Sequence, residues 1–309
     1  MRKIEIGKND GGQRLDRFLE KSLPGLPKSL KYKYIRKKRI KVNGKRAEIS
    51  TRLKEGDVLE LYINDEFFDS EKGKTDFIKA GTDLDVVYED ENIIVCNKPS
   101  GLLSHPDDSE YLDTLIMKIL RYLYDKGEYR PEEELSFTPA LVNRLDRNTG
   151  GLVIAAKDAE TLRILNEKIR NREIEKHYIC ETDGVPEPES GELEGYILKD
   201  REKNMVSLHK DPVKGGKPVH TVYRVIEKRD GRALVDVNLI TGRTHQIRVH
   251  FAEMGCPLTG DPKYGHGKKG EHQHLLSYKL VFSFTTDAGK LDYLEGKELA
   301  LTNFSFRNY

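Results

Sequence analysis

The 309-residue sequence has few of the features that would place it in a membrane or in an oxidising compartment. No apolar run approaches the ~18 residues that a membrane span needs, and the first residues lack the apolar core of a signal peptide. The three cysteines, Cys96, Cys180 and Cys256, lie far apart and form no Cys-x-x-Cys pair. We therefore expect a cytoplasmic protein with no membrane partner and with buried, reduced thiols rather than disulfides or zinc ligands.

The chain also has almost no net charge, +1, which by itself gives no reason to expect nucleic acid as a partner. The charge is unevenly distributed, however. Ten Lys or Arg residues and no Asp or Glu lie between Lys28 and Arg46, with Tyr32 and Tyr34 among them. Cations interleaved with aromatic rings are typical of a surface that binds RNA or DNA, although such a run can also be a solvated helix face.

Two short helices and a hairpin are predicted in this basic region. Apolar residues from Leu15 to Leu23 recur at helical spacing, and a second helix is expected to begin near Lys28. Asn43-Gly44 is the strongest two-residue signal for a β-hairpin. These elements make a compact unit that carries nearly all the excess positive charge.

This unit, residues 1–65, resembles the small RNA-binding module first known from ribosomal protein S-four. In that family the basic second helix and the following hairpin lie on structured RNA. The resemblance therefore implies that seven cations of this segment contact RNA: Lys31, Lys33, Arg36, Lys37, Lys38, Arg39 and Lys41.

We interpret residues 66–81 as a linker, because they are polar and show no sustained periodicity, and residues 82–309 as a second domain. The second domain mixes β-rich runs with helical patterns, without the regular spacing of βαβ units. We therefore predict an α+β fold with a mainly antiparallel mixed sheet, preceded by the small α/β RNA-binding unit. After a helix ending near Leu123, a polar stretch is expected to be a mobile loop, and Asp158 is expected to cap a later helix.

One carboxylate in the second domain lies in an unusual setting. The segment Asn143–Gly151 places Asp146 between Arg144 and Arg147, just before an apolar strand. Two guanidinium groups this close favour the ionised carboxylate, and an unprotonated carboxylate is what covalent catalysis needs. The competing interpretation is a solvated surface ion pair, which contributes little.

A second dense polar cluster is the segment Thr241–His250. Thr244 is the expected N-cap of a short helix in which Arg248 lies one turn from the start. His245 and His250 are five residues apart, so they do not share a helix face and we expect no metal there. The histidines that follow lie in a Gly- and Lys-rich loop, where we expect solvent rather than a metal: His266, His272 and His274.

Four motifs of the second domain occur in a characteristic order. They are Glu89–Gly101, Arg144–Arg147, Lys176–Tyr178 and Thr241–His250, the last followed by Gly260-Asp261-Pro262 and Tyr264-Gly265. From about residue 82 to 285 the chain resembles the ribosomal large-subunit pseudouridine synthases. A module of the ribosomal-protein-S-four type is usual in the branch of that family that acts on large-subunit ribosomal RNA.

The resemblance implies a role for each matching residue. Asp146 would attack the ribose or take a proton from it, and Arg248 would pair with Asp146 and keep it ionised. Tyr178 would stack on the target uracil or assist proton removal at carbon five, and Arg144 would fill the space left by the flipped nucleotide. The isomerisation needs no cofactor and no metal, and we expect a monomer. A second basic stripe would follow RNA phosphates toward the site: Lys168, Arg170, Arg172 and Lys176.

Two departures and three alternatives accompany this hypothesis. Relatives often have His at the position of Asn143, and Asp-Thr-Ser-Gly where this chain has Asn148-Thr149-Gly150-Gly151. The substrate could be transfer RNA instead of ribosomal RNA, or the chain could be a non-catalytic RNA-binding factor of ribosome assembly. A nucleoside hydrolase or glycosidase is disfavoured, because such enzymes need a paired acid or a metal and no second acidic residue flanks Asp146.

Overall fold

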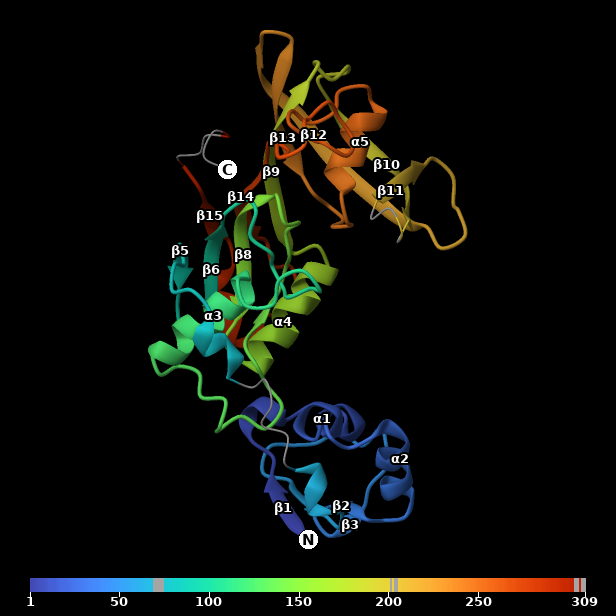
Figure 1. The fold of residues 1–309 in the computed structure, drawn as a ribbon, viewed down its shortest axis with the longest axis vertical. Helices are drawn as coiled ribbons and strands as arrows, with labels where there is room; N and C mark the ends of the chain where they lie inside the picture. Colours follow the sequence, from blue (N-terminus) through green and yellow to red (C-terminus); the bar gives the residue numbers. More distant parts are fainter. Residues whose placement is uncertain (69–74, 201, 203–204, 303–305, 307–309) are drawn as a thin grey trace.

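The computed structural model describes residues 1–68, 75–200, 202, 205–302 and 306. Within these residues, an N-terminal unit with a four-stranded sheet lies at one end of the molecule and a larger unit with an eleven-stranded sheet extends from it (Figure 1). No helix in this part of the chain combines the length and the apolar composition that a membrane crossing requires. All three cysteines are buried and unpaired, as expected, and burial raises the pKa of Cys96 to about 12.

The N-terminal unit confirms the predicted helices and hairpin. Its elements are β1 (Arg2–Glu5), η1 (Lys8–Asp10), α1 (Leu15–Ser22), α2 (Lys28–Arg36), β2 (Ile40–Val42), β3 (Lys45–Arg46) and β4 (Val58–Leu61), with antiparallel sheet order β1-β4-β2-β3. Leu15, Phe18 and Leu19 of α1 are fully buried in the core of this unit. Asn43 and Gly44 both have positive φ, 51° and 71°, which is the conformation that a tight two-residue hairpin turn needs.

The segment predicted as a linker is only partly an open connection. It contains η2 (Asp65–Phe67) and η3 (Asp76–Lys79), and residues 69–74 lie outside the described residues. Phe77 is buried, with ring centroids 5.7 Å from those of both Tyr124 and Tyr129. η3 therefore packs on the larger unit through one aromatic side chain, which the polar composition around it did not indicate.

The larger unit is built on one long, mainly antiparallel sheet. Its strands are β5 (Val86–Glu89), β6 (Ile93–Lys98), β7 (Ala140–Leu141), β8 (Gly150–Ala156), β9 (Ile174–Asp183), β10 (Ser190–Asp200), β11 (Met205–His209), β12 (Lys217–Arg229), β13 (Arg232–Asn238), β14 (Leu275–Phe282) and β15 (Glu298–Ala300). The main order is β11-β10-β12-β13-β9-β14-β8-β6-β5, and β8 with β14 is the one parallel pair recorded among the described strands. The α+β fold with a mainly antiparallel sheet is thus confirmed.

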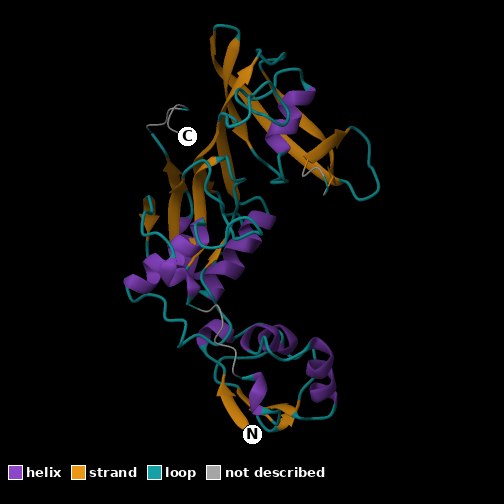
Figure 2. Ribbon diagram, in the orientation of Figure 1, coloured by secondary structure: helices purple, strands orange, loops and turns teal. Residues whose placement is uncertain are grey.

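Helices flank the two ends of this sheet. They are α3 (Leu115–Asp125), α4 (Ala159–Arg170), α5 (Gln246–Glu253) and the short η4 (Gly289–Leu294). Figure 2 shows α3 and α4 beside the β5–β8 end of the sheet and α5 beside the β10–β13 end. Asp158 caps α4 as predicted, accepting from the backbone N–H groups of Glu160 and Thr161 at 3.1 and 3.0 Å. The middle strands β8, β9 and β14 are left between the two helical groups, and the candidate site lies there.

The polar segment that follows α3 is a loop, as predicted, and its predicted mobility stays a prediction. Tyr129 within it is buried, and the segment binds the N-terminal unit. The Asn9 amide donates to Glu134 at 2.7 Å, and the Gln13 amide donates to the Ser136 hydroxyl at 2.7 Å. These contacts join residues more than a hundred positions apart, so the composition of the segment alone carried no sign of them.

Candidate active site

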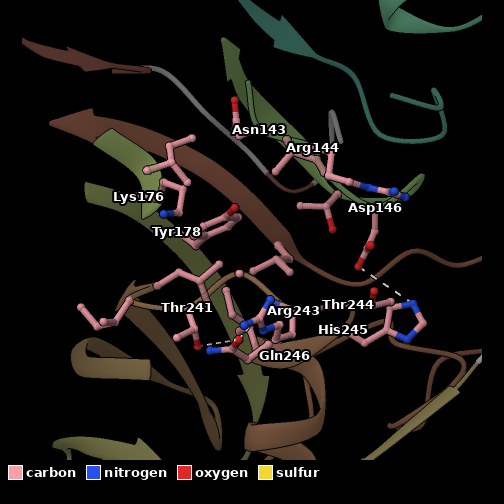
Figure 3. A pocket seen from close by; sticks show the side chains of 18 of the residues that line it. Asn143, Arg144, Asp146, Lys176, Tyr178, Thr241, Arg243, Thr244, His245 and Gln246 are labelled. Atoms are coloured by element: carbon pink, nitrogen blue, oxygen red, sulfur yellow. Dashed lines mark hydrogen bonds and ion pairs between the residues drawn. The ribbon is translucent and has the colours of Figure 1, made fainter. Parts of the chain in front are cut away.

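A cavity of about 520 Å³ opens between the Asp146 segment, β9 and the segment that leads into α5 (Figure 3). This volume is within the ~300–1,000 Å³ typical of ligand pockets. Asp146, Tyr178 and Arg248 all line it, although they come from three distant parts of the sequence. The other predicted site residues in its wall are Arg144, Arg170, Arg172 and Lys176.

A buried lysine anchors the backbone of the loop that carries Asp146. Lys98, at the end of β6, is fully buried and its Nζ donates to three backbone carbonyls, including that of Arg147, at 2.9, 2.7 and 2.9 Å. Burial lowers the pKa of Lys98 to about 7, and the negative charge of Asp146 opposes that shift. The three carbonyls match the three protons of the ammonium form. On the other side of Asp146, the Ser104 hydroxyl donates to the carbonyl of Leu145 at 2.8 Å.

The start of β8 shows what two residues contribute to the loop: Asn143, which departs from the usual family pattern, and Gly151, which agrees with it. The Asn143 amide donates to the carbonyl of Leu152 at 3.2 Å, and its oxygen accepts from the N–H of Ile154 at 2.8 Å. Gly151 has φ +112°, and a Cβ there would lie 2.1 Å from the carbonyl oxygen of Ser277 on β14. Glycine is therefore required where β8 meets its parallel neighbour. Asn143 in turn supplies the hydrogen bonds that hold the loop to this strand.

The predicted ion pair between Asp146 and Arg248 is wrong. Arg248 donates through Nε and Nη2 to the two carboxylate oxygens of Asp261, both at 2.7 Å, and the described residues form no ion pair between Arg248 and Asp146. Burial by itself raises the pKa of Asp261, but the hydrogen bonds and charge of Arg248 lower it below its usual value. Asp261 also accepts from the N–H groups of Lys263 and Tyr264, at 2.8 and 3.1 Å. The buried Arg248 guanidinium thus forms a bidentate ion pair with the fully buried Asp261 carboxylate.

Among the described residues, the titratable side chain within 4 Å of the Asp146 carboxylate is His245. Its Nε2 lies 3.9 Å from Asp146 Oδ2, and Figure 3 shows the carboxylate directed toward the imidazole. Burial lowers the pKa of His245 to about 4, so the ring is neutral at neutral pH. His245, and not Thr244, occupies the N-cap position of α5, in the left-handed conformation with φ 54° and no side-chain cap. In the sequence, His245 was considered only as a possible metal ligand, and that possibility was excluded.

Tyr178 lies on β9 with its ring in the cavity wall, and only 5% of the residue is exposed. Burial raises the pKa of Tyr178 above its usual value, and the charge of Asp146 adds to the shift. The phenol is therefore protonated at neutral pH. In this state it offers an aromatic face and a hydrogen-bond donor, and it is a poor proton acceptor.

The basic stripe that was predicted to follow RNA consists of two exposed arginines and two buried lysines. Arg170 and Arg172 are exposed at the end of α4, and Arg144, labelled in Figure 3, is exposed in the cavity wall. Lys168 is only 1% exposed and binds Glu173 at 2.7 Å, so it offers no charge to RNA and that prediction is corrected. Lys176 is also largely buried, and burial lowers its pKa, but it remains in the cavity wall.

The basic face of the N-terminal unit needs one similar correction. Lys31 is 3% exposed, with its Nζ 3.4 Å from the carbonyl of Asp16, so it packs between α1 and α2 instead of facing solvent. Its position on the buried side of α2 is the reason. The remaining cations of the predicted set are exposed or half-exposed: Lys33, Arg36, Lys37, Lys38, Arg39 and Lys41.

Comparisons with known proteins identify the family of this chain. The family model for RNA pseudouridylate synthase matches residues 92–253, and the model for the S4 domain matches residues 13–59. Ribosomal large subunit pseudouridine synthase C of Vibrio cholerae is 33% identical over 266 residues, which cover 85% of this chain and 80% of that protein. An uncharacterized RNA pseudouridine synthase of Mycoplasma genitalium is 30% identical over 99% of this chain and 94% of its own length.

A solved structure has the same fold. Human RNA pseudouridylate synthase domain containing 4 superposes with a TM-score of 0.57 at 21% identity, over 72% of this chain and 89% of the human one. The family match, the extent of the relatives and the fold all lead to one assignment. The chain belongs to the RNA pseudouridylate synthase family and is an isomerase that converts uridine to pseudouridine in RNA.

Proposed function

We propose that this enzyme isomerises uridines of large-subunit ribosomal RNA, in the cytoplasm and as a monomer. The substrate is supported by the relatives named for ribosomal large-subunit modification and by the S4 domain. The observation that carries the proposal is the shared cavity of Asp146, Tyr178 and Arg248.

We assign the central chemical role to Asp146. The reaction breaks the bond between ribose and the ring nitrogen and forms a bond from the same ribose carbon to carbon five. The nitrogen gains a proton and carbon five loses one, so there is no redox change. Asp146 is 29% exposed at its side chain and lies on a loop held on both sides, so an incoming nucleotide can reach it. It either attacks the ribose or takes a proton from it.

The other cavity residues receive positioning roles. A protonated, buried Tyr178 favours stacking of its ring on the uracil over direct proton removal from carbon five. Arg144 is exposed beside Asp146, where it can occupy the space of a flipped nucleotide or hold a phosphate. Arg248, fixed by Asp261, supplies a constant positive charge in the wall.

The exposed cations define a path for RNA. Helix α2 of the N-terminal unit, the end of α4 and the β10–β11 hairpin all lie toward the right-hand side of the view in Figure 1. Arg170 and Arg172 stand at the end of α4 and also border the cavity. Phosphate contacts of this kind position a nucleic acid without reading its sequence. We propose that structured RNA binds the α2 face while one nucleotide enters the cavity.

The activity is tested with RNA that carries tritium on carbon five of uridine. Wild type is expected to release tritium without free uracil, and Asp146→Asn is expected to release none. Asp230→Asn is the matched control, because that carboxylate is 86% exposed in a turn with φ 50°, which Asn tolerates. Free uracil would instead support a nucleoside hydrolase. No release from any ribosomal or transfer RNA would support a non-catalytic RNA-binding factor.

The substrate and the RNA path are tested separately. Transcripts of large-subunit ribosomal RNA are expected to be modified, and transfer RNA is expected to be left unmodified; the reverse would refute the proposed substrate. Replacing Arg36 and Lys37 with Gln is expected to raise KM, leave kcat unchanged, and lower the slope of log affinity against log salt by about one per lost phosphate contact. Lys228→Gln, on the exposed end of β12, is the control and is expected to change neither.

A further inference from the structure

His245 has a conformation that its surroundings must hold in place. It begins α5 with φ 54° and ψ 17°, a left-handed conformation that non-glycine residues adopt at a cost. The residue is 8% exposed and its ring forms part of the cavity wall. This conformation directs the imidazole at the catalytic loop, as Figure 3 shows, instead of at the backbone of its own helix.

The contacts of Tyr264 favour one tautomer of His245. The backbone N–H of Val206, on β11, donates to the Tyr264 hydroxyl at 2.8 Å, so that oxygen already serves as an acceptor. The hydroxyl proton is then available for His245 Nδ1, which lies 2.9 Å away. A neutral imidazole that accepts at Nδ1 carries its proton on Nε2. Nε2 is the nitrogen that faces Asp146.

Burial keeps the ring neutral, and the surrounding charges partly cancel: Asp146 and Asp261 raise the pKa of His245, whereas Arg248 and Lys263 lower it. Besides Asp146, the groups that act on His245 are Arg248, Lys263 and Asp261, and burial is the largest influence on its pKa. A neutral N–H can orient a carboxylate without transferring a proton to it. Two of the five N–H donors of Arg248, on Nε and Nη2, are engaged by Asp261.

The present separation of 3.9 Å between Nε2 and Oδ2 is longer than a hydrogen bond. A shift of about 1 Å by the Asp146 side chain would bring the two atoms into hydrogen-bond range. Catalytic hydrogen bonds are often long before substrate binds and shorten in the complex. Asp146 is partly exposed and free to make such a shift, whereas His245 is fixed by Tyr264.

We propose that His245 is a positioning residue for Asp146, whose neutral Nε2–H, fixed by Tyr264, orients the carboxylate when RNA is bound. The inference rests on the proposed role of Asp146 as the catalytic carboxylate. It gives His245 the orienting function that the resemblance had assigned to Arg248. It also gives Tyr264 a function outside the substrate cavity, since its hydroxyl selects the imidazole tautomer.

Two substitutions of His245 separate positioning from a structural role. The amide nitrogen of Gln reaches the place of imidazole Nε2, while the amide of Asn reaches only the place of Nδ1. Single-turnover tritium release is measured on a large-subunit ribosomal RNA transcript, with KM determined in parallel and folding checked by thermal unfolding. We expect His245→Gln to keep most of the rate and His245→Asn to lose roughly 10- to 100-fold in kcat with KM unchanged, as for a misplaced catalytic group.

A purely structural role predicts the opposite order. Asn tolerates the left-handed conformation better than Gln and can still accept from Tyr264. An active His245→Asn with an impaired His245→Gln would therefore overturn the proposal, and so would equal losses in the two variants. If both variants keep full activity while Asp146→Asn is inactive, the inference fails and the proposed function stands.

Tyr264→Phe provides an independent test, because it removes the hydroxyl that selects the tautomer. We expect a smaller loss of kcat than in His245→Asn, again with KM unchanged. Since both residues act through one contact, the double variant is expected to lose no more activity than His245→Asn alone. Losses that multiply in the double variant would refute the link between Tyr264 and Asp146.

Discussion

The buried pair of Arg248 and Asp261 allows a sharp prediction about Asp261→Asn. The two side chains are 5% and 0% exposed and share two hydrogen bonds of 2.7 Å. Asn keeps an oxygen for the backbone N–H groups of Lys263 and Tyr264, but it cannot accept both guanidinium donors and carries no charge. Removing one partner of a buried pair costs about 3–5 kcal/mol, because the other charge is left uncompensated.

This loss corresponds to a decrease in Tm of roughly 6–20 °C, at about 2–4 °C per kcal/mol for a chain of this size. The assay is thermal and urea unfolding of the full chain, together with tritium release. Glu189→Gln is the control, since Glu189 and Lys228 form an ion pair with side chains 58% and 52% exposed, and its loss is expected to cost under about 1 kcal/mol. If Asp261→Asn is as stable as Glu189→Gln, the pair does not stabilise the fold as reasoned here.

Three further changes test residues outside the cavity wall. Lys98→Met removes three donors to the backbone beneath Asp146 and is expected to cost roughly 3 kcal/mol in urea unfolding and to slow tritium release; unchanged values in both assays would contradict the anchoring role. Gly151→Ala places a Cβ 2.1 Å from a backbone oxygen and is expected to be far less stable by Tm than Gly231→Ala, whose Cβ would meet nothing within 4 Å; equal losses would refute the close approach. His250 is buried and neutral, and burial lowers its pKa to about 4. Its contribution to stability is complete above pH 6.5 and is lost between pH 6.5 and 4, by about 3 kcal/mol, so denaturation at several pH values should show a shallower acid loss in His250→Gln than in wild type.

Local sequence patterns predicted those parts of the protein that depend on nearby residues. Helical periodicity located α1 and α2, and Asp158 marked the start of α4, since a cap and the N–H groups that donate to it lie within three positions. The order of the four motifs identified the family. The same motifs named Asp146 and Tyr178, which the fold brings to one cavity.

Helix burial was less predictable, because the side of a short basic helix that faces the core depends on what packs against it. Lys31 and Lys168 were predicted to be exposed cations, yet both are buried. Lys31 lies beside the Asp16 carbonyl, and Lys168 forms an ion pair with Glu173. Long aliphatic stems allow lysine to pack this way when the amine finds an acceptor. A basic residue in a periodic pattern therefore does not reveal whether it faces solvent.

The sequence by itself determined the family, the α+β class and the loop of the carboxylate proposed to be catalytic, because motifs and short-range periodicity are written in consecutive residues. Only the tertiary structure decided the partners within the site. Two carboxylates, Asp146 and Asp261, were possible partners of Arg248, and the more deeply buried Asp261 binds it. That choice leaves His245, in a backbone conformation that no pattern indicated, as the neighbour of Asp146. Partner selection depends on distances and burial across the fold, and these exist only once the strands and helices have packed.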